Sequence, residues 1–125
     1  MAHNDEFITR KAAVAMGLDE TQYEWEAGMR FLWQRGGAAR FSPLADPADA
    51  YRLEDKLRIV VRYKSHVYGS GKVKLGILVS NDVAGAVHHA VADSTSSLEG
   101  RMYAVTQFAA LHTLMVEDDG EAIHG

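Results

Sequence analysis

Hydrophobic residues recur along this chain with two different periods, and the period changes several times between the two ends. In three stretches they lie three or four positions apart, which is the spacing of one face of an α-helix. These stretches cover residues 4–17, 47–57 and 96–116. Asn4 can cap the first helix, and Asp46 with Pro47 can begin the second. Ser96 with Glu99 resembles a capping box, so the sequence predicts three helices.

Between the first two helices the apolar residues alternate with polar ones, as in a half-buried β-strand. Met29, Phe31 and Trp33 lie on one side of this stretch, which ends at Gly36 and Gly37. The alternation predicts one strand between the first and second helices.

The most regular alternation follows the second helix and predicts a β-hairpin. One side of its two strands carries Ile59, Val61, Tyr63, Leu75, Ile77 and Val79. Residues 69–71, Gly-Ser-Gly, supply the positive backbone angles that a hairpin loop needs. Residues 83–92 fit either a strand or a short helix. We favour a third strand, because it completes an antiparallel meander.

The order of predicted elements is helix, strand, helix, three strands, helix. This order is typical of an α+β fold, with an antiparallel sheet of three or four strands. We expect the N- and C-terminal helices and one short middle helix to pack on that sheet. Residues 1–116 form a single domain in this interpretation, and residues 117–125 form a flexible acidic C-terminal tail. The chain has 125 residues, of which 47% are hydrophobic, enough for one core.

The composition excludes several classes of protein. With no cysteine, the chain can form neither disulfides nor thiolate sites. No apolar run reaches the ~20 residues that a membrane span needs. Residues 1–11 lack the apolar segment of a secretory signal, so we expect a cytoplasmic protein.

Charge is distributed unevenly along the chain, whose formal net charge is −4. Residues 51–74 contain seven lysines or arginines and two acids, whereas residues 75–125 contain seven acids and one arginine. Strand alternation gathers the basic residues of the predicted hairpin on one face. The candidate macromolecule-binding residues are Arg58, Arg62, Lys64, Tyr68, Lys72 and Lys74. The alternative interpretation is a solvated sheet face whose cations serve solubility and edge protection.

The stretch between residues 41 and 59 contains two prolines and several acids, so it can be a reactive site or an elbow. Asp46 can accept a hydrogen bond from the amide of Asp49, and Asp49 faces the positive end of the helix. Glu54 and Asp55 lie on the polar side of that helix. Because capping explains the aspartates, we interpret the stretch as an elbow.

Three stretches also carry a family resemblance: KAAVAMGL at 11–18, FSPLADPADAYRLEDKLRI at 41–59 and GRMYAVTQFAALH at 100–112. Together they resemble the phage ABA sandwich domain, a family of small tailed-phage and prophage proteins with no established activity. Phe41 and Ser42 stand where that family has tryptophan and asparagine, and Arg101 stands alone where it has paired arginines. The resemblance implies helices on both sides of the sheet and residence in a bacterial host cytoplasm. It implies no catalytic residue.

The remaining candidates for chemistry each have a simpler structural explanation. The GSGK motif of the hairpin lacks the second half of a P-loop and joins two strands. His88 and His89 point to opposite faces of a strand and cannot bind one metal ion. His112 lies on the apolar stripe of the last helix, and a meeting of these histidines in the fold stays open. Trp25 and Trp33 can stack on a ligand, yet aromatic residues near a strand more often fill a core.

The sequence contains no nucleophile with an adjacent base, no ligand cluster and no cofactor loop. We therefore expect a non-catalytic phage or prophage accessory protein that binds a macromolecule, with a phage or host protein as the partner. Nucleic-acid binding through the basic face of the 58–74 hairpin is the alternative. A small hydrolase or metal-dependent enzyme is the third hypothesis. We expect no cofactor, no metal and no membrane partner, and a homo-oligomer stays open because nothing identifies a contact surface.

Overall fold

The computed structural model describes residues 4–67, 69–71, 73–90 and 97–124. It contains three α-helices, α1 (Asp5–Ala15), α2 (Pro47–Leu57) and α3 (Ser97–His124), and a 3-10 helix, η1 (Glu20–Gln22). The strands are β1 (Tyr23–Glu26), β2 (Phe31–Gln34), β3 (Arg40–Phe41), β4 (Val60–Val67), β5 (Val73–Asn81) and β6 (Gly85–Ala90). The strand pairs are antiparallel, so the predicted α+β class is confirmed. No helix of the described residues has the length and apolar character to cross a membrane.

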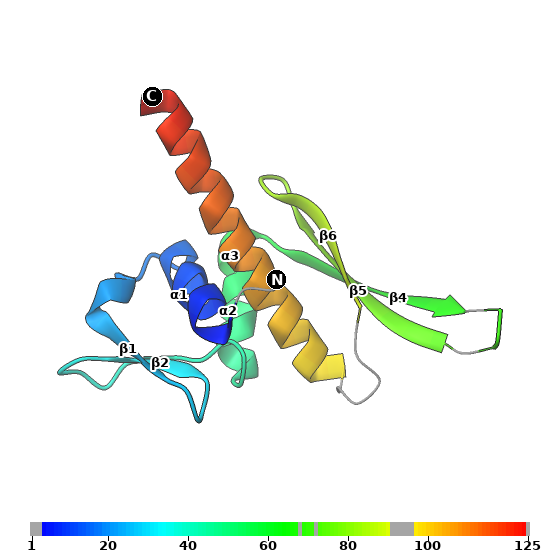
Figure 1. Ribbon diagram of the computed structural model, residues 1–125, viewed down its shortest axis with the longest axis horizontal. Coiled ribbons are helices and arrows are strands. Elements are labelled where there is room, and N and C mark those ends of the chain that lie inside the picture. The colour runs from blue at the N-terminus through cyan, green and yellow to red at the C-terminus, as the bar shows by residue number, and fades with distance from the viewer. Residues whose placement is uncertain (1–3, 68, 72, 91–96, 125) are drawn as a thin grey trace.

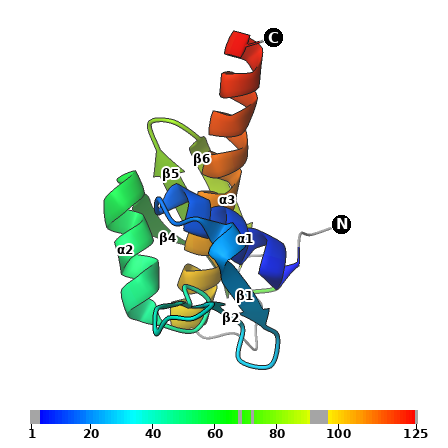
Figure 2. The same cartoon turned by 90° about the vertical axis from the view of Figure 1, so that its left-hand side faces the viewer.

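The C-terminal helix α3 runs through the middle of the fold. Figure 1 shows α1 and the β1–β2 hairpin on one side of α3 and the β4–β5–β6 sheet on the other. The helix α2 packs beside both α1 and α3 (Figure 2). The first half of α3 is buried on several sides, at Gly100, Met102, Ala104, Val105, Thr106, Phe108, Ala109 and Ala110. A helix that is apolar around most of its circumference belongs in a core, which explains its central place.

The C-terminal end of α3 differs from the prediction. The helix continues through His124, although the sequence predicted an end at residue 116. Lys11 of α1 donates hydrogen bonds to both carboxylate oxygens of Glu117 at 3.1 Å, and this contact ties the helix down past the predicted end. The flexibility of the acidic tail stays a prediction. The predicted capping box depends on Ser96, which lies outside the described residues.

The strands form two three-stranded sheets, β1–β2–β3 and β4–β5–β6, instead of a single sheet. The stretch predicted as one strand is the β1–β2 hairpin, in which Glu26 pairs with Phe31. Met29 and Arg30 lie in the turn, where Arg30 adopts a φ of 57°. The sequence did not indicate this turn, because a residue with a positive φ is usually glycine or asparagine, and here it is an arginine.

The buried side of β2 is the opposite of the predicted one. Leu32 is completely buried and belongs to the same core cluster as Ala12 and Ala13 of α1. Trp33, which the alternation placed with Phe31 on the apolar side, is 36% exposed. Because α1 packs on the Leu32 side of β2, Phe31 and Trp33 lie on the outer side of this sheet.

The β4–β5 hairpin is confirmed. Val67 pairs with Val73 at the end of the ladder, and Gly71 in the loop has a φ of 85°. Residues 85–90 form strand β6, which settles the strand-or-helix alternative in favour of a strand. Ile77 and Val79 of β5 are buried on the side of the sheet that faces α3.

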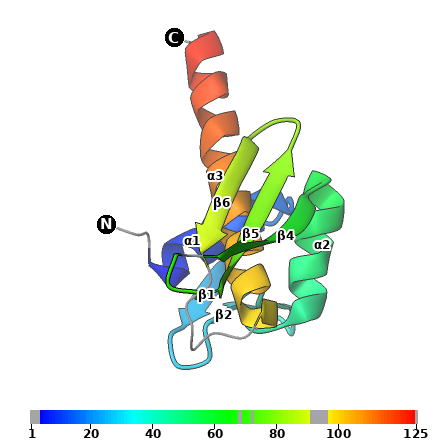
Figure 3. The ribbon, with the colours of Figure 1, turned by 90° about the vertical axis from the view of Figure 1, so that its right-hand side faces the viewer.

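The other side of this sheet is named the basic face, and it carries Val60, Arg62, Lys64, Leu78 and Ala86. Figure 3 looks onto this face, and no helix of the described residues lies in front of the strands. Four of its residues, all but Leu78, are exposed. The family resemblance implied helices on both sides of the sheet, whereas the described helices all lie on the other side.

The stretch between β3 and α2 is an elbow held by its two aspartates. Asp46 caps α2 by accepting a hydrogen bond from the amide of Ala48 at 3.0 Å. The amide of Asp49, which was the predicted donor, instead binds the backbone carbonyl of Asp46. Asp49 is 5% exposed, and its carboxylate accepts from the amide of Ser42 at 2.8 Å and from Arg52 at 3.0 Å. Both carboxylates therefore hold backbone groups in place.

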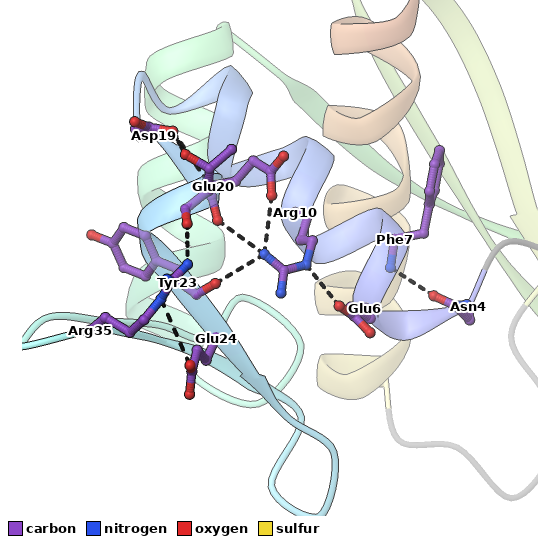
Figure 4. Close-up of polar contacts among 10 residues, drawn as sticks. Asn4, Glu6, Phe7, Arg10, Asp19, Glu20, Tyr23, Glu24 and Arg35 are labelled. Carbon is purple, nitrogen blue, oxygen red and sulfur yellow. Dashed lines mark hydrogen bonds and ion pairs between the residues drawn. The ribbon is translucent and has the colours of Figure 1, made fainter.

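Arg10 of α1 positions the start of the β1–β2–β3 sheet (Figure 4). Its Nη1 donates to the backbone carbonyls of Glu20 at 3.0 Å and Tyr23 at 3.1 Å, and to the Glu20 carboxylate at 3.0 Å. Its Nε donates to Glu6 at 2.8 Å. Burial lowers the pKa of Arg10, but its hydrogen bonds with Glu6 and Glu20 outweigh burial and raise it. A permanently charged side chain thus joins α1 to the sheet.

Candidate functional site

The structure places some of the predicted binding residues together on β4 and β5. Arg62 and Lys64 are both exposed on the basic face. Lys74 pairs with His66 near the loop, two positions from the partner of Lys64, so its register position is on the same side of the sheet. The other two hairpin residues, Tyr68 and Lys72, lie outside the described residues.

The prediction that Arg58 lies on the same strand as Arg62 was wrong, and its role in binding stays a prediction. This residue is the C-cap of α2, with a φ of 53° and a ψ of 48°, and β4 begins only at Val60. Its backbone amide points back to the carbonyls of Asp55 and Glu54. The predicted strand began too early in the sequence, because no glycine or proline marks the boundary between α2 and β4. Arg58 is therefore not aligned with Arg62 on the sheet.

The basic face combines cations with exposed apolar surface. Val60 is 47% exposed, and the half-buried Leu78 lies opposite Arg62 in the register. Neither Arg62 nor Lys64 forms an ion pair with any residue in the part of the chain that the structure describes. Such a surface can receive carboxylates or phosphates that lie beside apolar groups.

Tyr63 of β4 lies on the opposite side of the sheet, where Arg101 of α3 holds it. The Arg101 Nη1 is 3.4 Å from the Tyr63 hydroxyl, and its guanidinium carbon is 5.9 Å from the ring centre. The hydrogen bond with Glu54 raises the pKa of Arg101 more than burial lowers it. Tyr63 therefore fixes β4 against α3 and does not offer a stacking surface beside Arg62.

The histidines form no site among the described side chains. His112 is half-buried, and its Nδ1 lies 3.3 Å from the side-chain nitrogen of Asn81. The same nitrogen donates to the carbonyl of Leu57 at 3.0 Å. The half-buried His112 thus lies at the edge of the core. His88 and His89 occupy adjacent positions of β6, and whether their side chains meet His112 lies outside what the structure describes.

Metal and nucleotide sites find no support in the described part of the chain. No group of three or more histidine, aspartate or glutamate residues there could hold a metal ion. The GSGK motif connects β4 to β5 and so joins two strands, whereas a P-loop joins a strand to a helix.

The outer side of the β1–β2–β3 sheet is a second candidate surface, which sequence reasoning missed. This aromatic face carries Glu24, Glu26, Phe31, Trp33 and Arg40 on three neighbouring strands. The guanidinium carbon of Arg40 lies 5.0 Å from the centre of the Phe31 ring, within cation–π distance. Trp25, on the other side of the sheet, packs into the core. The two tryptophans considered for stacking are therefore divided between core and surface.

Two shallow hollows adjoin the Phe31–Arg40 pair. The first, of about 430 Å³, is also lined by Trp33 and residues 37–39. The second, of about 330 Å³, extends past Met29 to the elbow. Met29 is 67% exposed, so apolar surface continues along this side of the molecule. The apolar residues of this stretch of sequence indicated an apolar surface. The part of the surface that β3 contributes can be recognised only when the pairing of the strands is known.

Comparisons of this chain with protein-family models, with curated proteins and with solved structures found no match. The resemblance to the phage ABA sandwich domain therefore stays a prediction made from three stretches of sequence. A function has to be argued from the two exposed sheet faces.

Proposed function

We propose that this protein is a non-catalytic binding module whose basic face docks a protein partner. The observation that carries the proposal is that one whole side of the β4–β5–β6 sheet has no helix over it among the described residues (Figure 3). The exposed side chain of Val60 lies on this side of the sheet, beside Arg62 and Lys64. Protein interfaces typically combine an apolar centre with polar and charged groups around it. Because these cations have no ion-pair partner among the described residues, they favour a partner that presents acidic side chains.

A protein suits this surface better than nucleic acid does. The formal net charge of −4 opposes the nonspecific attraction to phosphate on which nucleic-acid binding largely depends. Single-stranded binding faces also stack bases on aromatic rings. The aromatic residue of β4 in the described part, Tyr63, is held by Arg101 on the other side of the sheet.

We further propose that the protein acts as a phage or prophage accessory protein in a bacterial host cytoplasm. The support is the resemblance of residues 11–18, 41–59 and 100–112 to the phage ABA sandwich domain. A host or phage protein is the partner that this setting favours.

The test is a capture experiment from phage-infected bacterial cells with and without nuclease. The tagged wild type is compared with Arg62→Glu/Lys64→Glu, which reverses the exposed charges of the basic face. The matched control, Lys56→Glu/Arg58→Glu, makes the same change in net charge at the end of α2. We expect a protein that survives nuclease, is recovered by the wild type and the control, and is lost with the basic-face variant. Equal recovery by all three would contradict the proposed face.

Nucleic acid is the second candidate, because Arg62 and Lys64 have no ion-pair partner among the described residues. Fluorescence anisotropy with labelled single-stranded and duplex oligonucleotides tests it. This candidate requires affinity that falls steeply, by about tenfold or more, between low and physiological salt. It also requires a loss of binding with the basic-face variant and not with the control.

A further inference from the structure

We propose that two copies of this chain associate through their aromatic faces. The proposal does not rest on the function proposed above, since the aromatic face and the basic face lie on opposite sides of α3 (Figure 1). A dimer of this kind leaves both basic faces accessible.

The first support is apolar surface that the monomer leaves uncovered. Trp33 is 36% exposed and Met29 is 67% exposed, and the two hollows lie between these residues around Phe31 and Arg40. Aromatic residues, methionine and arginine are the residue types enriched in the buried centres of protein interfaces. The composition of this face therefore matches an interface better than it matches a solvated surface.

The second support is a pair of opposite charges that have no ion-pair partner among the described residues. Most described arginines bind a carboxylate: Arg10, Arg30, Arg35, Arg52 and Arg101. Arg40 forms no such pair with a described residue and lies over the ring of Phe31. Glu26 likewise has no ion-pair partner there, although it accepts a hydrogen bond from the amide of Gly28 at 3.0 Å. Both side chains line the first hollow.

The strand order makes these two charges complementary in a symmetric pair. Glu26 is on β1, Arg40 is on β3, and Phe31 and Trp33 are on β2 between them. When two such sheets stack face to face about a two-fold axis along β2, the β1 strand of one copy lies over the β3 strand of the other. In the register Arg40 lies two positions from the Glu26–Phe31 pair, but its guanidinium reaches back over the Phe31 ring. Glu26 of each copy therefore approaches the Arg40 guanidinium of the second copy, and the aromatic residues meet at the axis. An isologous dimer needs this kind of self-complementary surface.

The size of the surface limits the affinity that we expect. The three strands contribute four, four and two residues, fewer than the roughly 20–30 residues per partner of a standard interface. The dimer is therefore weak, with a Kd on the order of micromolar to tens of micromolar. Two other occupants, an acidic peptide and a nucleobase stacked on Trp33, are the alternatives that remain if the wild type is monomeric.

Sedimentation equilibrium of the full chain over a concentration series from about 0.5 to 500 µM brackets such a Kd. We expect reversible dimerisation of the wild type, weakened about tenfold or more by Trp33→Ser. We also expect the single variants Glu26→Arg and Arg40→Glu to be monomeric by themselves, because each juxtaposes like charges twice. An equimolar mixture of these two variants should dimerise again, since both cross-copy pairs are then attractive.

Recovery in the mixture excludes a folding defect as the cause of the loss, because a misfolded variant is not restored by a second one. A wild type that stays monomeric throughout the series would overturn the proposal and would leave the face to another occupant. Dimerisation that is unchanged by the three substitutions would also overturn it, because the contact would then lie elsewhere. Failure of the mixture to dimerise would overturn the two-fold arrangement.

Discussion

Arg101 of α3 and Glu54 of α2 form a two-point ion pair, with Nη2 2.5 Å from Oε1 and Nε 3.2 Å from Oε2. Their side chains are only 24% and 12% exposed. The Arg101 guanidinium also lies 5.4 Å from the ring centre of Tyr51 and 5.9 Å from that of Tyr63. One side chain thus connects the central helix to α2 and to the strand that presents Arg62.

We expect Arg101→Leu to lower the free energy of unfolding by about 3 kcal/mol, because it leaves the shielded Glu54 carboxylate without its counter-ion. Urea denaturation measures the change. Glu54→Leu/Arg101→Leu should recover part of the loss, since no unpaired charge remains. Arg35→Leu breaks an exposed pair with Glu24 and should cost less than about 1 kcal/mol. Additive losses in the double variant would mean that the two charges do not act as a pair.

Asp49 provides the test of the elbow. Asp49→Ala should lower the free energy of unfolding by about 2 kcal/mol, because the amide of Ser42 loses its acceptor in a protected position. Arg52→Ala removes the other partner of the same carboxylate, but the Arg52 side chain is 69% exposed. Its effect should stay below about 1 kcal/mol. Similar losses for the two variants in thermal unfolding would contradict the structural role assigned to the Ser42 amide.

The elements that could be predicted are those whose signals are local. Asn4 caps α1 by accepting from the amide of Phe7 at 2.7 Å, and Asp46 caps α2, so both helices begin where the sequence indicated. The β4–β5 hairpin follows from its alternation and its glycines. Alternation does not reveal which side of a strand a distant helix will cover. The burial of Leu32 by α1 therefore could not be predicted.

Of the two candidate surfaces, the basic face could be predicted from the sequence and the aromatic face could not. Arg62 and Lys64 share a face because side chains alternate along any strand, whatever the rest of the fold does. The aromatic face requires the pairing of Trp33 with Arg40 across two strands. That pairing depends on a two-residue strand, which is too short to carry a periodic signal of its own.

Thr9 is a buried polar residue whose replacement should stabilise the protein. It is fully buried, and its hydroxyl has no hydrogen-bond partner among the described residues. Thr9→Val keeps the shape and removes the unsatisfied group, so we expect the free energy of unfolding to rise by about 1 kcal/mol. The matched control is Thr113→Val, because the Thr113 hydroxyl donates to the carbonyl of Lys11 at 2.7 Å. That variant should be destabilised by about 1 kcal/mol in the same chemical denaturation series. Changes of the same sign would contradict the difference between the two sites.

Asp19 begins the 3-10 helix and should titrate below its ordinary pKa of 3.8. Its carboxylate accepts hydrogen bonds from the Thr21 hydroxyl at 2.6 Å and the Thr21 amide at 3.1 Å, and both lower its pKa by favouring the charged form. The contribution to stability is therefore complete above the unfolded pKa and is lost as the pH falls through the folded one. An NMR titration of the Asp19 carboxyl carbon measures the pKa. Thr21→Ala should raise it toward 3.8, and an unchanged value would assign the shift to another cause.

Arg58 allows the backbone requirement at the end of α2 to be separated from binding. Its φ of 53° costs an L-residue roughly 1–2 kcal/mol, and glycine avoids this cost because it has no Cβ. Glycine is also more flexible in the unfolded chain, which offsets part of the gain. We expect Arg58→Gly to raise the free energy of unfolding by about 0.5 kcal/mol and Arg58→Ala not to do so.

The same two variants report on the basic face. Because Arg58 lies outside that face, neither substitution should change the capture of a partner that depends on Arg62 and Lys64. If Arg58→Gly and Arg58→Ala were equally stable in urea denaturation, the helix would not require a left-handed residue at its end. If both variants lost the partner while staying folded, Arg58 would belong to the binding surface in spite of its place at the C-cap. The combination of higher stability and unchanged binding is the result that the geometry of α2 and β4 predicts.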